Sequence, residues 1–86
     1  MSNREKYDEI FMETFDISND ALSENLEYQS IPAWDSVGHM SLMAALEDEF
    51  DISLEMDDII EFGTYLTGIE TMKKYGVNME WILNIC

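Results

Sequence analysis

The sequence predicts an all-α domain, a small antiparallel four-helix bundle with three longer helices and a short third one. Apolar residues recur at three- and four-residue steps in several segments, and no segment is rich in strand-forming residues. Most connections are short, which favours antiparallel neighbours. With 86 residues, 47% of them hydrophobic, the chain suffices for a single domain with one compact core. We expect that core within about residues 3–76, followed by a tail at 77–86.

The first helix is expected over roughly residues 3–15. Ser2 and Glu5 have the spacing of a capping box, and apolar residues follow on one helical face. A long connection comes next, with one short turn around Asp20–Ser23 and an extended segment before Pro32. We expect its larger apolar side chains to hold it against the core: Leu22, Leu26, Tyr28, Ile31 and Trp34.

The second helix is expected over about Ser36–Phe50, followed by the short extended piece "DISLEM". "DDIIEFG" then predicts a short helix that begins near Asp57 and ends before Gly63. In "TGIETMKKYG", Thr67 and Glu70 have capping-box spacing, and two lysines suit the last turn. Gly76 would end this helix. In the tail, apolar residues either pack on the bundle, which we favour, or bind a dedicated partner: Trp81, Ile82, Leu83 and Ile85.

The charge balance narrows the partners. Nineteen acids face four bases, so the net charge is −15. Nucleic acids and anionic membranes are bound through basic patches, which makes both unsuitable. The acids either attract basic protein surfaces or simply keep the chain soluble. Cys86 is the single cysteine, which excludes an intrachain disulfide. The charged start resembles no signal peptide, and no apolar run approaches the ~18 residues of a membrane span, so a cytoplasmic monomer is expected.

The second helix has two distinct faces. One carries an ordinary core stripe that includes His39, which we expect to be packed and hydrogen-bonded. The other is small or apolar near Val37 and Met40 and acidic near Glu47 and Asp48. Such a face is either a docking surface or an ordinary exposed face with a few apolar residues. Asp35 and Ser36, at the start of this helix, are typical capping residues. A helix N-terminus also favours a phosphate, so Ser36 could instead carry a phosphodiester.

The stretch "DSVGHMSLMAALEDEFDI" resembles the modification motif of acyl carrier proteins: Asp-Ser-Leu/Val, a helical apolar stripe and an acidic end before Phe. The resemblance extends over roughly residues 4–76. It implies a stand-alone acyl or peptidyl carrier, a phosphoprotein and not an enzyme. Ser36 would be esterified with the 4′-phosphopantetheine of coenzyme A, with Asp35 as part of the motif. The thiol of that arm would carry an acyl or aminoacyl group as a thioester.

The resemblance also implies partners. A phosphopantetheinyl transferase would install the arm, a ligase or transferase would load the cargo, and a synthase or transferase with a basic surface would receive it. The pathway would make fatty acids, polyketides, nonribosomal peptides or polysaccharides. The second helix would be the recognition helix, with residues from it and from the short helix meeting partners: Val37, Met40, Glu47, Asp48, Asp57 and Asp58.

The motif departs from the usual pattern after the serine. Gly38 and His39 replace the acidic or small polar residues common in fatty-acid carriers, and Trp34 replaces a glycine-rich approach. These features resemble carriers of specialised bacterial pathways, such as surface-polysaccharide clusters. Gly38 also lowers helix propensity in the first turn.

Two alternatives remain. Asp16–Glu27 places acidic or hydroxyl residues at five ligand positions of an EF-hand calcium loop. However, Ala21 replaces the turn glycine, Pro32 interrupts the expected exiting helix, and no second loop pairs with it. The other alternative is an acidic adaptor that uses the second helix without modification. Such an adaptor would tolerate Ser36→Ala.

Overall fold

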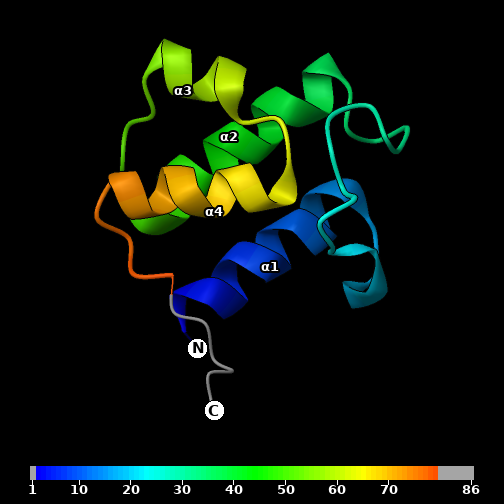
Figure 1. The fold of residues 1–86 in the computed structure, drawn as a ribbon, viewed down its shortest axis with the longest axis horizontal. Helices are drawn as coiled ribbons and strands as arrows, with labels where there is room; N and C mark the ends of the chain where they lie inside the picture. The colour runs from blue at the N-terminus through cyan, green and yellow to red at the C-terminus, as the bar shows by residue number, and fades with distance from the viewer. Residues whose placement is uncertain (1, 80–86) are drawn as a thin grey trace.

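The structure is a computed structural model that describes residues 2–79. Within this range the chain forms four α-helices, and the only β-pairing is an isolated bridge between Glu27 and Thr64. The all-α class and the four helices are therefore confirmed. The helices are α1 (Asn3–Phe15), α2 (Ser36–Phe50), α3 (Met56–Glu61) and α4 (Tyr65–Lys74), with a 3₁₀ turn at Asn19–Ala21 (Figure 1).

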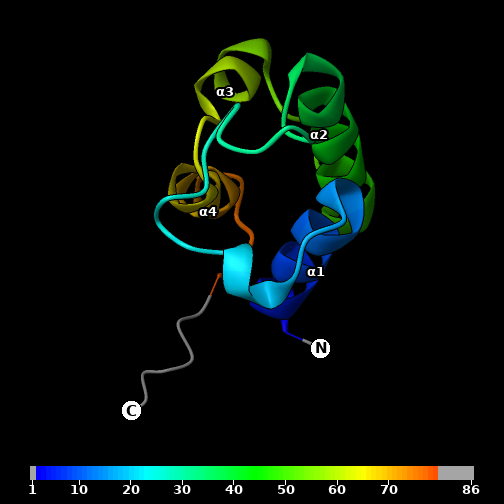
Figure 2. The ribbon, with the colours of Figure 1, turned by 90° about the vertical axis from the view of Figure 1, so that its right-hand side faces the viewer.

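The helices are arranged so that α3 lies beside α2 and above α4, while α1 lies under α2 (Figure 2). The segment between α1 and α2 runs along one side of the molecule and brings its middle against the short connection between α3 and α4. Along the described residues, no helix is both long enough and apolar enough to cross a membrane.

The first two helices begin where their capping residues predict. Ser2 and Glu5 form the capping box, since the Ser2 hydroxyl accepts the Glu5 N–H at 3.1 Å and Glu5 accepts the Ser2 N–H at 2.9 Å. α2 begins at Ser36 after an Asp35 cap and ends at Phe50, which confirms the predicted bounds.

The predicted start of the last helix is wrong. α4 begins at Tyr65, because Thr64 is the cap and its hydroxyl accepts the Thr67 N–H at 2.9 Å. Tyr65 is held in place at this position, since its N–H donates to the Leu26 carbonyl at 3.0 Å and its side chain is buried. Thr67 and Glu70 therefore form no capping box. The two lysines do lie in the last turn, and Gly76 follows with a φ of 87°.

The core is dominated by aromatic side chains that α1 shares with the long loop. Trp34 is fully buried, stacks on Phe15 with ring centres 5.2 Å apart, and meets Phe11 edge-on at 5.6 Å. Leu26 is buried as well, whereas Tyr28 remains at the surface. Leu22 and Ile31 are partly buried against the same core, so four of the five predicted side chains hold the loop and fix the chain just before α2.

The core extends past Gly76, because Val77 and Met79 are also buried. The first residues of the expected tail therefore pack on the bundle. The tail residues for which packing was favoured lie outside the described residues: Trp81, Ile82, Leu83 and Ile85.

Candidate functional site

Ser36 is the first residue of α2 and is exposed to solvent. The preceding Asp35 caps the helix: its carboxylate accepts the Gly38 N–H at 2.8 Å, and its carbonyl accepts the His39 N–H at 2.8 Å. Of the two residues predicted to cap the helix, only Asp35 does so. The Ser36 hydroxyl takes no part in capping and is available at the surface of a helix N-terminus.

The Ser36 hydroxyl has one side-chain partner in the described part of the chain, the hydroxyl of Tyr28 at 3.0 Å. The Tyr28 hydroxyl is not a base of the kind that activates a serine nucleophile, such as a histidine or a carboxylate. His39 is close in the sequence, but both of its ring nitrogens are engaged elsewhere. Among residues 2–79, therefore, no base is hydrogen-bonded to the Ser36 hydroxyl.

His39 joins three parts of the fold. The indole of Trp34 can only donate, so Nδ1 of His39 accepts its N–H at 2.9 Å. The carbonyl of Ile59 in α3 can only accept, so Nε2 donates to it at 2.8 Å. These two contacts assign one neutral tautomer. The prediction of a packed and hydrogen-bonded histidine is confirmed, and it connects the loop, α2 and α3.

Gly38 is explained by close contact and not by flexibility. A β-carbon at this position would lie 2.0 Å from the carbonyl oxygen of Ala33 and 3.3 Å from the ring of Phe15. The loop backbone therefore passes directly against the first turn of α2. The glycine that departs from the carrier motif allows the buried Trp34 loop to approach Ser36.

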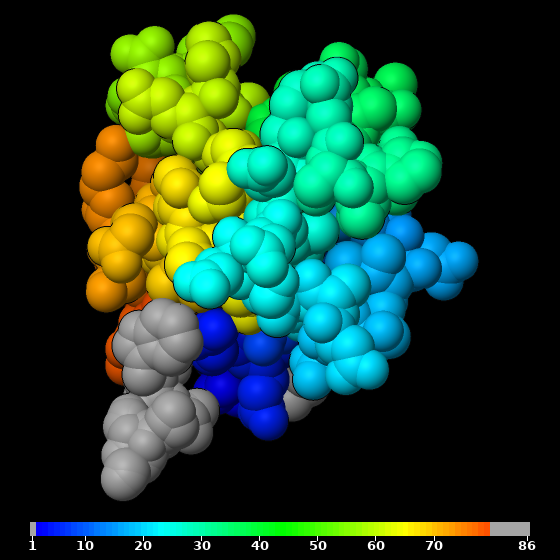
Figure 3. All heavy atoms as spheres, turned by 45° about the vertical axis from the view of Figure 1, so that its right-hand side comes forward, coloured from blue at the N-terminus to red at the C-terminus, as the bar shows by residue number. Residues whose placement is uncertain are grey.

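A pocket of about 400 Å³ lies next to Ser36, between α2 and α3. Figure 3 shows the hollow between the atoms of α3 and those of the loop and the start of α2. Its polar groups are at the Ser36 and Tyr28 side, whereas the α3 side is apolar. The lining residues are Tyr28, Ser36, His39, Met40, Met56, Ile59, Ile60, Phe62 and Gly63.

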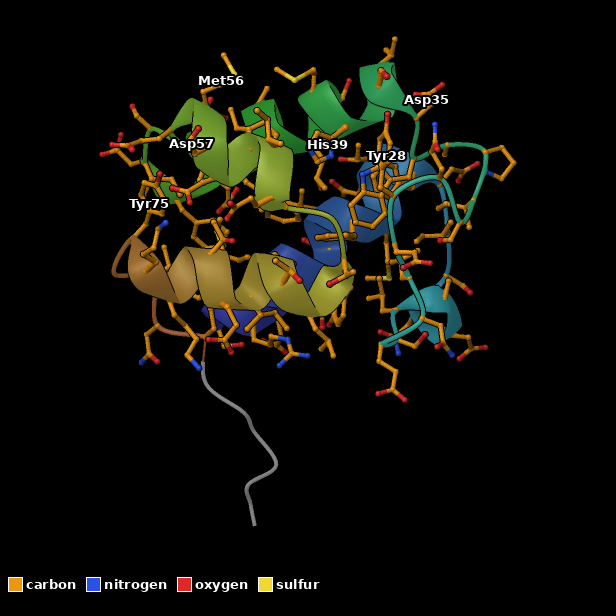
Figure 4. All side chains as sticks on the ribbon, turned by 45° about the horizontal axis from the view of Figure 1, so that its top comes forward. Tyr28, Asp35, His39, Met56, Asp57 and Tyr75 are labelled. Atoms are coloured by element: carbon orange, nitrogen blue, oxygen red, sulfur yellow. The ribbon has the colours of Figure 1, made fainter. Side chains whose placement is uncertain are left out.

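Four exposed apolar side chains surround this region. Val37 and Met40, which the sequence singled out, are 75% and 55% exposed. Met56 and Ile60 of α3 are each 70% exposed and were not predicted. Figure 4 shows Met56 pointing away from the other helices. A short helix gives too few turns for periodicity to separate its core face from its outer face, so this signal was absent from the sequence.

The predicted acidic docking residues separate into two groups. Asp48 and Asp57 are exposed, as docking requires. Glu47 is half-buried and accepts the Leu54 N–H at 2.8 Å, so it fixes the chain after α2. Asp58 is buried, with 7% of its surface exposed, and its carboxylate is bound by Lys74 and Tyr75. The expectation that Asp58 faces partners is corrected, because these contacts turn it inward.

The Asp58 contacts attach α3 to the end of α4. Lys74 donates to one carboxylate oxygen and the Tyr75 hydroxyl to the other. The Tyr75 oxygen in turn accepts the Glu55 N–H at 2.8 Å, just before α3, where Glu55 gives no side-chain cap. The pKa of Asp58 is lowered mainly by the hydrogen bond from Lys74 and, to a smaller extent, by that from Tyr75. The hydrogen bonds to Asp58 in turn raise the pKa of Lys74 and the pKa of Tyr75.

The calcium-loop alternative finds no support in the geometry. Residues 28–35 form turns, so no helix leaves the Asp16–Glu27 segment as an EF-hand requires. Between residues 2 and 79 no group of three or more acidic, histidine or cysteine side chains could hold a metal ion.

The chain matches no protein-family model, and comparison with curated proteins gives no match. A functional proposal therefore rests on the geometry around Ser36 and on the resemblance of the motif.

Proposed function

We propose that the chain is a cytoplasmic, monomeric carrier protein of the acyl carrier type, an antiparallel bundle with 4′-phosphopantetheine on Ser36. One observation carries the proposal: Ser36 is an exposed hydroxyl at a helix N-terminus, beside an apolar pocket, and no base among residues 2–79 is hydrogen-bonded to it. A hydrolase would need a base at that hydroxyl. A tether needs only access, and this serine has it.

The residues around Ser36 fit a phosphodiester. The first N–H groups of a helix lack intrahelical partners, and the helix dipole favours negative charge there. The Asp35 carboxylate accepts the N–H of Gly38, the third residue of α2. The N–H groups of Ser36 and Val37, the first two residues of the helix, are not bound by this cap. These N–H groups and the Tyr28 hydroxyl would hold the phosphate. When bound, the arm supplies a terminal thiol that carries the cargo as a thioester.

The pocket would shelter the part of the arm or cargo nearest to Ser36. Its opening includes the serine, and its α3 wall is formed by apolar side chains such as Ile59 and Ile60. Burial of apolar surface contributes roughly 25 cal/mol per Å², enough for a short apolar group to favour the pocket over water.

The exposed apolar residues and acids near Ser36 would form the docking surface. Val37 and Met40 would contact partners directly, and Asp48 and Asp57 would attract basic side chains. The partners would be a phosphopantetheinyl transferase, a loading ligase or transferase and a synthase that receives the cargo. Electrostatic attraction gives fast association without tight binding, as a carrier that visits several enzymes requires.

A labelling experiment tests this function. A broad-specificity phosphopantetheinyl transferase with magnesium and a fluorescent coenzyme A analogue should label the wild-type chain once. Ser36→Ala should abolish the label. Ser41→Ala is the matched control, because Ser41 is also exposed on α2 but lies a turn beyond the N-terminus. Label that survives in Ser36→Ala, or no label in the wild type, would favour the unmodified adaptor.

A further inference from the structure

Tyr28 is a loop residue that meets the modification site. Its hydroxyl lies 3.0 Å from the Ser36 hydroxyl, eight residues further along the chain. We propose that Tyr28 is a positioning residue for the phosphate on Ser36, which it binds through its phenolic O–H. This inference rests on the proposed carrier function and assigns to that site a donor outside the Asp-Ser motif.

The backbone of Tyr28 is fixed before any phosphate arrives. Its N–H donates to the carbonyl of Gly63 at 2.8 Å, and the adjacent Glu27 forms the isolated bridge with Thr64. The loop is therefore joined to the connection between α3 and α4 directly at Tyr28. This attachment places the tyrosine at the opening of the pocket without any contribution from its hydroxyl.

The ring of Tyr28 is also supported. It meets the imidazole of His39 edge-on, with ring centres 5.6 Å apart and planes at 76° (Figure 4). His39 itself cannot turn freely, because Trp34 and Ile59 bind its two nitrogens. The phenol is thus held by packing against a fixed neighbour, which is how a binding group is preorganised.

Modification changes the hydrogen bond in a defined way. In the free chain either hydroxyl can donate to the other. When the Ser36 oxygen bonds to the phosphorus on the pantetheine side of coenzyme A, the pyrophosphate bond breaks and adenosine 3′,5′-bisphosphate leaves. The serine oxygen gives its proton to a base of the transferase, so it can no longer donate. Tyr28 must then be the donor, and the better acceptor is a charged non-bridging oxygen of the phosphate, next to the ester oxygen. A hydrogen bond to an anionic oxygen is stronger than one between neutral groups, so the contact gains strength on modification.

The basic residues of the chain do not compete for this role. All four form ion pairs elsewhere: Arg4 with Asp8, Lys6 with Glu49, Lys73 with Glu70, and Lys74 with Asp58. A phosphate on Ser36 would therefore depend on neutral donors, which are the helix N–H groups and the Tyr28 hydroxyl. Contact with Tyr28 would direct the phosphate towards the loop side, so that the arm starts at the opening of the pocket.

Tyr28→Phe isolates the hydroxyl, because the ring and the backbone hydrogen bond to Gly63 remain. Tyr75→Phe is the matched control, since it removes a hydrogen-bonded hydroxyl that binds Asp58. Phosphorus NMR of the modified proteins reports the phosphate directly. We expect the phosphodiester resonance to shift in Tyr28→Phe and to stay at the wild-type position in Tyr75→Phe. Loss of one hydrogen bond should also lower kcat/KM for arm transfer to Tyr28→Phe about 2- to 10-fold.

The outcomes separate this inference from the proposed function. A modified Tyr28→Phe chain with the wild-type phosphorus resonance and the wild-type kcat/KM would overturn the role of Tyr28 and leave the carrier function standing. A wild-type chain that accepts no arm would overturn both. Unfolding midpoints of the two variants distinguish a local change at the phosphate from a general loss of stability.

Discussion

The indole N–H of Trp34 donates to Nδ1 of His39 at 2.9 Å, which joins the buried end of the long loop to α2 one turn after Ser36. The other nitrogen of the same ring donates to the Ile59 carbonyl of α3. One side chain thereby sets the positions of three segments that border the pocket. Trp34 is fully buried, so its N–H has no water to replace a lost acceptor.

His39→Leu should destabilise the fold by about 1–3 kcal/mol, because it leaves the Trp34 N–H and the Ile59 carbonyl without partners. His39→Gln should lose less, since its amide can restore one of the two hydrogen bonds. Urea unfolding followed by tryptophan fluorescence measures both. Equal stability of His39→Leu and wild type would show that the His39 contacts contribute nothing.

Gly38→Ala should lower stability by about 1–3 kcal/mol, although alanine is favoured over glycine by about 1 kcal/mol in a helix. The reason is the carbonyl of Ala33, only 2.0 Å from the added carbon. Gly63→Ala is the control, because the nearest atom there is 3.8 Å away. Thermal unfolding of both variants tests this, and a stabilised Gly38→Ala would refute the close approach of the loop.

Asp58→Asn should lower the unfolding midpoint at neutral pH, whereas Asp57→Asn, at the exposed neighbouring position, should change it little. The contacts of Asp58 favour its charged form, so they attach α3 to α4 more strongly while the carboxyl is ionised. Equal effects of the two substitutions would contradict the buried position of Asp58.

The same carboxyl gives a pH dependence with a defined sign. The pKa of Asp58 is lower in the folded chain than its ordinary value of 3.8, so the unfolded state binds its proton first as the pH falls. Its stabilising contribution is therefore complete only well above the ordinary pKa of 3.8 and is lost as the pH falls through the folded pKa. The stability difference between wild type and Asp58→Asn should shrink over that range. NMR titration of the Asp58 carboxyl measures the pKa itself.

Reversal of the exposed acids should weaken partner docking without unfolding the chain. Asp48→Lys combined with Asp57→Lys should raise KM for phosphopantetheinyl transfer up to about tenfold at low salt and leave kcat nearly unchanged. The effect should fade at high salt because the charges are screened. Glu13→Lys, at an exposed position of α1, is the control. Identical KM values for all three proteins would remove these acids from the docking surface.

Local signals in the sequence were sufficient for α1 and α2. The capping residues Ser2 and Asp35 mark where each helix starts, and periodic apolar residues follow directly. The start of α4 was missed because Thr64 and Thr67 both resemble caps. The choice between them depends on the Leu26 carbonyl, which binds the Tyr65 N–H from a distant part of the chain.

The site was only partly predictable for the same reason. The exposed positions of Ser36, Val37 and Met40 at the start of α2 could be predicted, because they follow from the helix to which these residues belong. The inward turn of Asp58 depends on Lys74 and Tyr75, 16 and 17 residues away, and "DD" alone does not indicate which acid is buried. The contact of Tyr28 with Ser36 depends on the path of the loop, which no local pattern encodes.

We propose that Ser36 is the tether for a phosphopantetheine arm. Intact-protein mass spectrometry after incubation with coenzyme A, magnesium and a broad-specificity phosphopantetheinyl transferase tests it most directly. The wild-type chain and Ser41→Ala should each gain the mass of one phosphopantetheinyl group, and Ser36→Ala should gain none. No increment in the wild type, or the same increment in Ser36→Ala, would contradict the claim.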